Sequence, residues 1–176
     1  LLPDMQIEII DSRTISMATG YIALAAARAA EEGKSLLECA EVAREALDRV
    51  GAFITVETLE YLHRGGRIGG ARKLLGNALN IKPILTVRDG VVAESGKVRT
   101  RKKALRHVLD EVSEAVTGKE NIRLAALHAV APEEATALLQ DASERIKPVE
   151  SHLTELSPVV GAHVGPGTVG LVWYTD

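Results

Sequence analysis

The alternation of helical and strand patterns is the feature that most constrains the fold of this 176-residue chain. The predicted strands cover residues 5–10, 52–56, 82–87, 91–93, 122–128, 149–156 and 169–174, and the predicted helices cover 17–32, 36–47, 57–63, 71–80, 100–116 and 132–146. Asp89-Gly90 separates two of these strands as a tight turn, which makes that pair antiparallel. The pattern predicts an α/β fold with a mixed sheet that contains an antiparallel hairpin and is flanked by helices.

Several helix ends are marked by capping residues. Gly33 stands where a residue in the left-handed conformation commonly ends a helix. Ser35 and Glu38 have the spacing of a capping box. Thr100 is suited to cap the helix that follows it, and Pro132 is suited to a first helical turn.

The composition excludes several classes of protein. Aromatic residues make up only 3% of the chain, so we expect a core of Ala, Leu, Val and Ile and no base-stacking surface for nucleic acid. The net charge of −3 also argues against nucleic acid as a partner. The longest apolar run, residues 21–27, is far shorter than the ~20 residues of a membrane helix, so no stable membrane insertion is expected. Cys39 is the single cysteine and is expected to be buried, which is compatible with the cytoplasm.

Residues 64–70, Arg-Gly-Gly-Arg-Ile-Gly-Gly, form a candidate anion-binding loop. Its glycines allow close approach of another group, and Arg64 and Arg67 offer guanidinium donors. The alternative is a loop that ends a helix and carries two solvated arginines.

A second candidate is the basic stretch 97–106. If Thr100 is the cap, Arg101 and two lysines lie in the first helical turn, where each cation opposes the helix dipole at a cost of ~0.3–1 kcal/mol. A helix that begins with several cations favours the binding of an anion or an acidic partner at that end. The alternative is a solvated basic patch with carboxylates nearby.

The third candidate is His163, in the glycine-rich stretch 160–170. Residues 165–170 match Gly-x-Gly-x-x-Gly, but they lead into a strand, so they are not a dinucleotide-binding fingerprint. A histidine on a loop can donate a hydrogen bond to a carboxylate; the alternative is a structural histidine. The five histidines lack metal-ligand spacing, and no nucleophile motif or Walker A motif occurs, so neither a metal, a cofactor nor a catalytic group is predicted.

In combination, these motifs resemble the DegV family. The matching segments extend over nearly the whole chain: Ile-Ile-Asp-Ser at 9–12, Leu-Glu-Tyr-Leu at 59–62, Gly-Gly-Arg-Ile at 65–68, Leu-Asn-Ile-Lys-Pro-Ile-Leu at 79–85, Lys-Val-Arg-Thr-Arg-Lys-Lys-Ala at 97–104, His-Ala at 128–129 and Val-Gly-Ala-His-Val-Gly-Pro-Gly at 160–167. Each segment alone is weak evidence, whereas the composite is specific.

The resemblance implies a bacterial two-domain α/β carrier, not an enzyme, that holds one long-chain fatty acid. Its partner would be a fatty acid kinase, which makes acyl-phosphate for phospholipid synthesis in the cytoplasm. The implied residues are His163, Arg67, Gly165 and Gly167 for the ligand, and Lys97, Arg99 and Arg101 for the phosphate or the kinase.

The resemblance also implies a domain organisation. Residues 1–50 are expected to be the end of an N-terminal domain that is otherwise missing, and residues 51–176 a DegV-like C-terminal domain. The family's Thr-Ser-x-Pro-Ser and Ser-Gly-Thr segments, which supply hydroxyls to the carboxylate, are not in this sequence. Two alternatives are a phosphotransfer protein related to dihydroxyacetone kinases, with His163 binding substrate covalently, and a nucleic-acid binder that uses residues 99–106.

Overall fold

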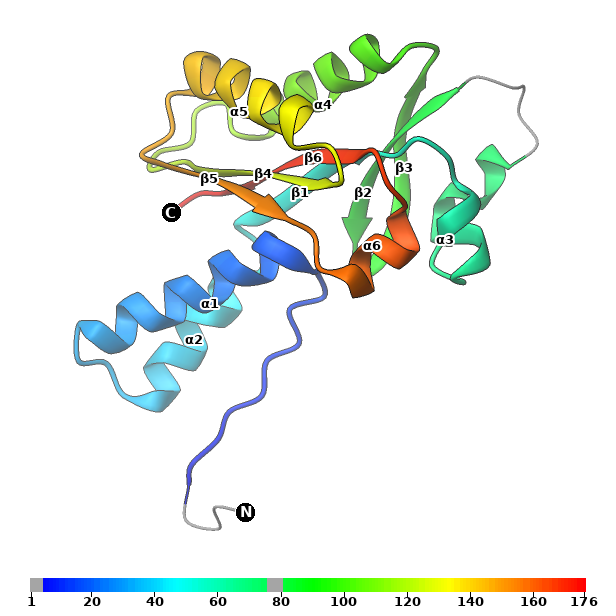
Figure 1. Cartoon of the computed structure of the whole chain (residues 1–176). Coiled ribbons are helices and arrows are strands. Elements are labelled where there is room, and N and C mark those ends of the chain that lie inside the picture. Colours follow the sequence, from blue (N-terminus) through cyan, green and yellow to red (C-terminus); the bar gives the residue numbers. More distant parts are fainter. Residues whose placement is uncertain (1–4, 76–80) are drawn as a thin grey trace.

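The computed structural model describes residues 5–75 and 81–176, and it contains a six-stranded mixed sheet (Figure 1). The strands are β1 (Val50–Thr55), β2 (Lys82–Arg88), β3 (Val91–Val98), β4 (Arg123–Ala129), β5 (Glu150–Glu155) and β6 (Thr168–Tyr174), in the order β3-β2-β1-β6-β4-β5. β4 and β5 are parallel, and the other neighbours are antiparallel. The predicted fold class is therefore confirmed.

Helices cover both faces of the sheet. They are α1 (Ser16–Glu31), α2 (Leu36–Ala46), α3 (Glu60–Arg64), the 3-10 helix η1 (Gly69–Leu74), α4 (Arg101–Ala115), α5 (Pro132–Ile146) and α6 (Pro158–Val164). The long helices α4 and α5 cover one face, while α1 and α2 lie on the other (Figure 1). α3, which follows β1, and α6, which precedes β6, lie together at the end of these two central strands, and this end of the sheet carries the candidate site.

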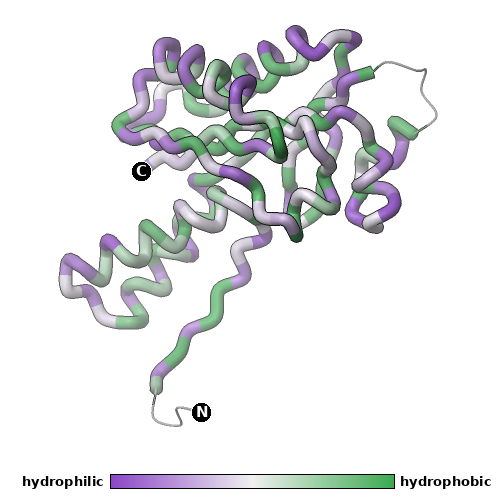
Figure 2. Tube along the Cα trace, in the orientation of Figure 1, coloured by the Kyte–Doolittle hydropathy of each residue, from purple (hydrophilic) through white to green (hydrophobic). Residues whose placement is uncertain are grey.

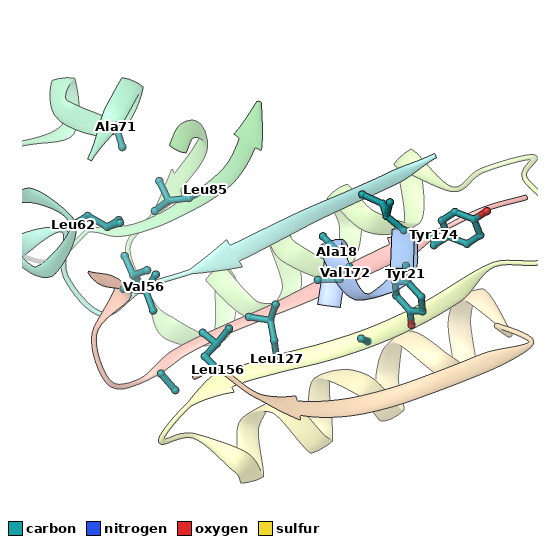
Figure 3. Packing of buried hydrophobic residues seen from close by; sticks show 14 of the residues in the cluster. Ala18, Tyr21, Val56, Leu62, Ala71, Leu85, Leu127, Leu156, Val172 and Tyr174 are labelled. Carbon is teal, nitrogen blue, oxygen red and sulfur yellow. The ribbon is translucent and has the colours of Figure 1, made fainter. Parts of the chain in front are cut away.

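The core is mainly aliphatic, as the composition predicts. On the face of α1 the buried side chains include Tyr21, Leu127 and Val172, and Val56 and Leu62 continue this cluster toward α3 (Figure 3). A second cluster lies beneath α4 and α5 and is built from Ala, Val, Leu and Ile. Hydrophilic residues recur along the outer turns of these two helices (Figure 2). Each sheet face therefore buries apolar side chains against helices, which is the main stabilising contribution to such a fold.

The local signals in the sequence explain the element boundaries. The capping box of Ser35 and Glu38 forms, and the hydroxyl of Thr100 accepts a hydrogen bond from the Lys103 amide. Asp89 and Gly90 both have positive φ angles, 50° and 77°, as a tight hairpin turn between β2 and β3 requires.

Three expectations were wrong. Residues 5–10 are not a buried strand: they pair with no strand of the described chain, and Met5, Ile7 and Ile9 are exposed. A 3-10 helix ends at Leu74 where an α-helix over 71–80 was expected, and residues 76–80 of that expectation lie outside the described residues. Cys39 is half-buried, because α2 packs through its alanines and turns the thiol toward the edge of the contact. The domain boundary near residue 50 stays a prediction.

The ion pairs around Glu150 predict a loss of stability in acid. Its carboxylate contacts His152 (2.6 Å) and Arg28 (2.7 Å), and these groups hold its pKa below the usual range although burial opposes them. A lowered folded-state pKa stabilises the fold above the unfolded pKa of about 4.3, and this stabilisation is lost as pH falls through the folded-state value. We expect Glu150→Gln to lower the free energy of unfolding at neutral pH, and the difference from the wild type to shrink as pH falls through the lowered pKa of Glu150. Urea titrations across this pH range measure both proteins. Glu155→Gln is the control, and a difference that persists in acid would contradict this assignment.

Candidate functional site

The candidate site lies where α3 and α6 meet at the end of the central strands β1 and β6 (Figure 1). His163 belongs to the last turn of α6, so the expectation that it lies on a loop was wrong. Ser157 caps this short helix by accepting a hydrogen bond from the Val160 amide, and Pro158 occupies its first turn. The Ser-Pro pair was the sequence signal for α6.

Two ring–glycine contacts join α3 and α6. The Nδ1 atom of His163 lies 2.2 Å from where a Cβ on Gly65 would stand, so only glycine fits there. Reciprocally, the ring of Tyr61 comes within 2.3 Å of where a Cβ on Gly165 would stand. The glycine loop after α3 and the histidine of α6, both selected from the sequence, therefore lie in direct contact.

His163 has a polar atom that no described group satisfies. Its Nδ1 is buried, and it has no hydrogen-bond partner among the residues that the structure describes. Most buried polar side-chain atoms have a partner, and an unpaired one calls for an explanation. The side chain as a whole is half-buried, so a ligand that reaches this corner meets the rest of the ring, while Nδ1 faces Gly65.

Arg67 and Arg64 have different positions. The guanidinium of Arg67 is exposed and donates a hydrogen bond to the carbonyl of Gly65 (3.0 Å), the residue against which His163 packs. Arg64 instead pairs with Glu60 on the outside of α3, at 2.5 Å. Of these two arginines, Arg67 is the one whose side chain binds Gly65, the glycine in contact with His163.

The basic stretch 97–106 divides into two parts. Lys97 and Arg99 are exposed, at the end of β3 and just before α4. Arg101 points inward: it binds Glu134 of α5 and donates a hydrogen bond to the carbonyl of Gly167 (2.6 Å). The negative charge of Glu134 also compensates the positive charge of Arg101 at the start of α4. This agrees with the alternative interpretation of residues 97–106, a basic patch with carboxylates nearby.

An aliphatic core lies directly behind this corner. Val164 of α6 and Leu62 of α3 are buried, and they share one cluster with Val56, Leu85 and Leu156 (Figure 3). The site therefore combines cationic and imidazole donors at the surface with apolar side chains below, which suits a ligand with an anionic head and an apolar tail.

Residues 5–75 and 81–176 contain no group of three or more His, Cys, Asp or Glu side chains arranged to hold a metal ion. Within the same ranges, no helix is long and apolar enough to cross a membrane.

Comparison with known proteins decides the family. The model of the DegV family, a family described as uncharacterised, matches residues 1–176. The chain belongs to the DegV family. It is 40% identical over 173 residues to a DegV domain-containing protein of Clostridium acetobutylicum, covering 98% of this chain and 60% of that protein. A Streptomyces coelicolor relative is 38% identical over 167 residues, covering 94% and 59%.

Solved DegV structures share the fold. A DegV protein from Thermus thermophilus, described by its fatty acid binding, superimposes with a TM-score of 0.92 at 33% identity and covers 98% of this chain and 62% of that one. The fatty acid binding protein DegV from Bacillus subtilis gives 0.83 at 32% identity, covering 95% and 60%. A stearic acid-binding protein from Eubacterium ventriosum gives 0.81 at 25% identity, covering 98% and 60%. The chain thus spans about three fifths of the length of these DegV relatives.

The DegV motif residues fall into two groups in space. His163, Arg67 and Gly165 gather at the α3–α6 corner, and Gly167 lies next to them in the turn before β6. Lys97 stands near the end of β3, and Arg99 lies between β3 and α4. The Leu79-Asn80 part of the motif set lies outside the described residues.

Sequence reasoning missed three residues that shape the site: Tyr61, Glu57 and Glu134. Tyr61 stands inside a segment that carries the DegV resemblance, which was the available signal. The two glutamates had none, because their roles depend on contacts between distant segments.

Proposed function

We propose that this chain binds a long-chain fatty acid, with the carboxylate at the α3–α6 corner beside His163 and Arg67. The acyl chain would lie against half-buried apolar side chains that border the aliphatic cluster, such as Val160 of α6, because Val56, Leu62 and Leu85 are themselves fully buried. Membership of the DegV family and similarity to DegV proteins described as fatty-acid-binding support this proposal.

The observation that carries the proposal is the half-buried imidazole of His163, which packs on Gly65 next to the exposed Arg67. A carboxylate accepts hydrogen bonds from an imidazole N–H and from a guanidinium. Because a buried charge without donors is costly, a fatty acid head group requires such a pair. Gly165 and Gly167 would serve by shaping the turn beside the head group.

The acyl chain would supply most of the affinity. Each buried methylene contributes ~0.8 kcal/mol, and the cost of association and ordering offsets part of the sum. The resemblance also implies hydroxyl donors from segments that this chain lacks. We therefore expect a form that includes those segments to bind more tightly than the chain alone.

The protein would act as a cytoplasmic carrier and not as an enzyme, and would present the bound acid to a fatty acid kinase. Lys97 and Arg99 are exposed cations near the start of α4, where they can steer an acidic partner. Arg101 was grouped with them as a phosphate or kinase contact, but its side chain already has internal partners.

We expect Lys97→Glu combined with Arg99→Glu to weaken kinase-dependent phosphorylation of the bound acid about tenfold at low ionic strength, with fatty-acid affinity unchanged. The measurement is acyl-phosphate formation against salt concentration, with purified fatty acid kinase. Lys119→Glu combined with Arg145→Glu reverses the same charge far from this edge and is the control. Kinetics equal to the wild type at low salt would contradict the assignment of this surface.

Fluorescent fatty-acid titration tests the binding proposal itself. Saturable binding that unlabelled stearic acid displaces would support it. Absence of binding, together with phosphorylation of dihydroxyacetone in a kinase assay, would favour the phosphotransfer alternative.

A further inference from the structure

Arg101 is the centre of a charged cluster that links several elements at the site edge. Its side chain is only 18% exposed. Nε donates to both carboxylate oxygens of Glu134 (3.2 and 3.1 Å), and Nη2 donates to Glu134 Oε2 and to the carbonyl of Gly167, each at 2.6 Å. Nη1 lies 3.5 Å from Oε1 of Glu57, whose other oxygen pairs with Lys82. One guanidinium thus connects the starts of α4, α5 and β6 with the end of β1.

The turn that Arg101 holds comes directly after α6. It consists of Gly165, Pro166 and Gly167, and both glycines have positive φ angles of 80° and 77°. Glycines lose more conformational freedom on folding than other residues, so such a turn depends on outside contacts to keep one conformation.

The contacts reach the turn from two sides. The buried hydroxyl of Thr168 donates to the carbonyls of Val164 (3.0 Å) and Gly165 (2.9 Å). Arg101 binds the carbonyl of Gly167, and the missing Cβ of Gly167 leaves room for the Glu57 side chain, whose Cγ would lie 2.6 Å from such an atom. A hydrogen bond from a charged donor is roughly twice as strong as a neutral one, so the Arg101 contact is the stronger restraint.

We propose that Arg101 is a positioning residue for His163. By fixing the carbonyl of Gly167, it holds the turn after α6 and thereby the imidazole against Gly65. Glu57 and Glu134 orient the guanidinium and neutralise its charge. The expected effect of Arg101 on fatty-acid affinity rests on the proposed function. The effect of Arg101 on the position of His163 does not, because that position can be measured without a ligand.

The first test is NMR of the histidine side chains in the ligand-free chain labelled with 13C-histidine. We expect Arg101→Gln to shift the ring signals of His163, while the ring signals of the exposed His63 stay unchanged. Arg101→Lys should not return the His163 signals to their wild-type positions, because a lysine ammonium lacks the planar set of donors with which the guanidinium binds Glu134 and Gly167 together. Glu57→Gln, a milder change should Arg101→Gln fold poorly, is expected to give a smaller shift of the same signals. Arg106→Gln, one turn further along α4, is the control.

The second test is a double-mutant cycle on the affinity for stearic acid. We expect Arg101→Gln to weaken binding about tenfold in the wild type and to have little effect in the His163→Ala background. Unchanged His163 signals in Arg101→Gln and Glu57→Gln, or an equal loss of affinity in both backgrounds, would overturn the proposal. If the wild type binds no fatty acid, the proposed function fails, and the NMR result alone decides the role of Arg101.

Discussion

His163→Ala is expected to weaken fatty-acid binding by roughly ten- to a hundredfold while the chain stays folded. The substitution removes a hydrogen bond to a charged group, which contributes ~1.5–3 kcal/mol. The apolar contacts of the acyl chain remain, so binding should be reduced and not abolished. The measurement is a titration with a fluorescent fatty acid, together with a urea melt.

The melt separates a ligand group from a structural one. Because Nδ1 of His163 has no partner in the described structure and the ring is half-buried, its loss should change the free energy of unfolding by less than ~1 kcal/mol. His63→Ala, on the exposed side of α3, is the matched control and should affect neither quantity. Unchanged affinity with a collapsed melt would mean that His163 is structural and that the site is misplaced.

Gly165→Ala is expected to be the most destabilising single substitution at the site. Gly165 has φ 80° and ψ 163°, a region of backbone conformation that is essentially restricted to glycine. A methyl group there would also stand 2.3 Å from the Tyr61 ring. Strain and overpacking each cost ~1–3 kcal/mol, so we expect a loss of about 3 kcal/mol or more and a marked loss of fatty-acid affinity.

Gly161→Ala provides the comparison for this substitution. Gly161 lies inside α6, whereas Gly165 follows its last residue, and no neighbouring atom comes within 4 Å of where a Cβ on Gly161 would stand. Alanine in a helix is favoured over glycine by about 1 kcal/mol, so this variant should be neutral or slightly more stable. Urea melts of both variants check the pair, and a Gly165→Ala protein as stable as the wild type would show that the Tyr61–Gly165 contact is not needed.

The sequence predicts those parts of the fold that depend on local signals. The Asp89-Gly90 hairpin, the capping box at Ser35 and the helix after Thr100 all form as expected, because each is specified within a few residues. Residues 5–10 show the limit of such reasoning, since an apolar run becomes a strand only where another strand pairs with it.

The site was only partly predictable for the same physical reason. Motif matching selected His163, Arg67 and the glycines, but not the contact of Tyr61 with Gly165, which joins distant segments. Arg101 was expected to face a partner, because its neighbours in sequence are basic. Its partners Glu134 and Gly167 are 33 and 66 residues away, and no local pattern indicates them.

Native mass spectrometry of the purified chain, with and without added stearic acid, tests the central claim most directly. The account predicts a species heavier than the chain by the mass of one long-chain fatty acid, and a smaller fraction of that species in His163→Ala at the same ligand concentration. A wild-type spectrum that shows only the unliganded mass at saturating stearic acid would contradict fatty-acid binding by this chain. Equal occupancy of the two proteins would contradict the placement of the carboxylate at His163.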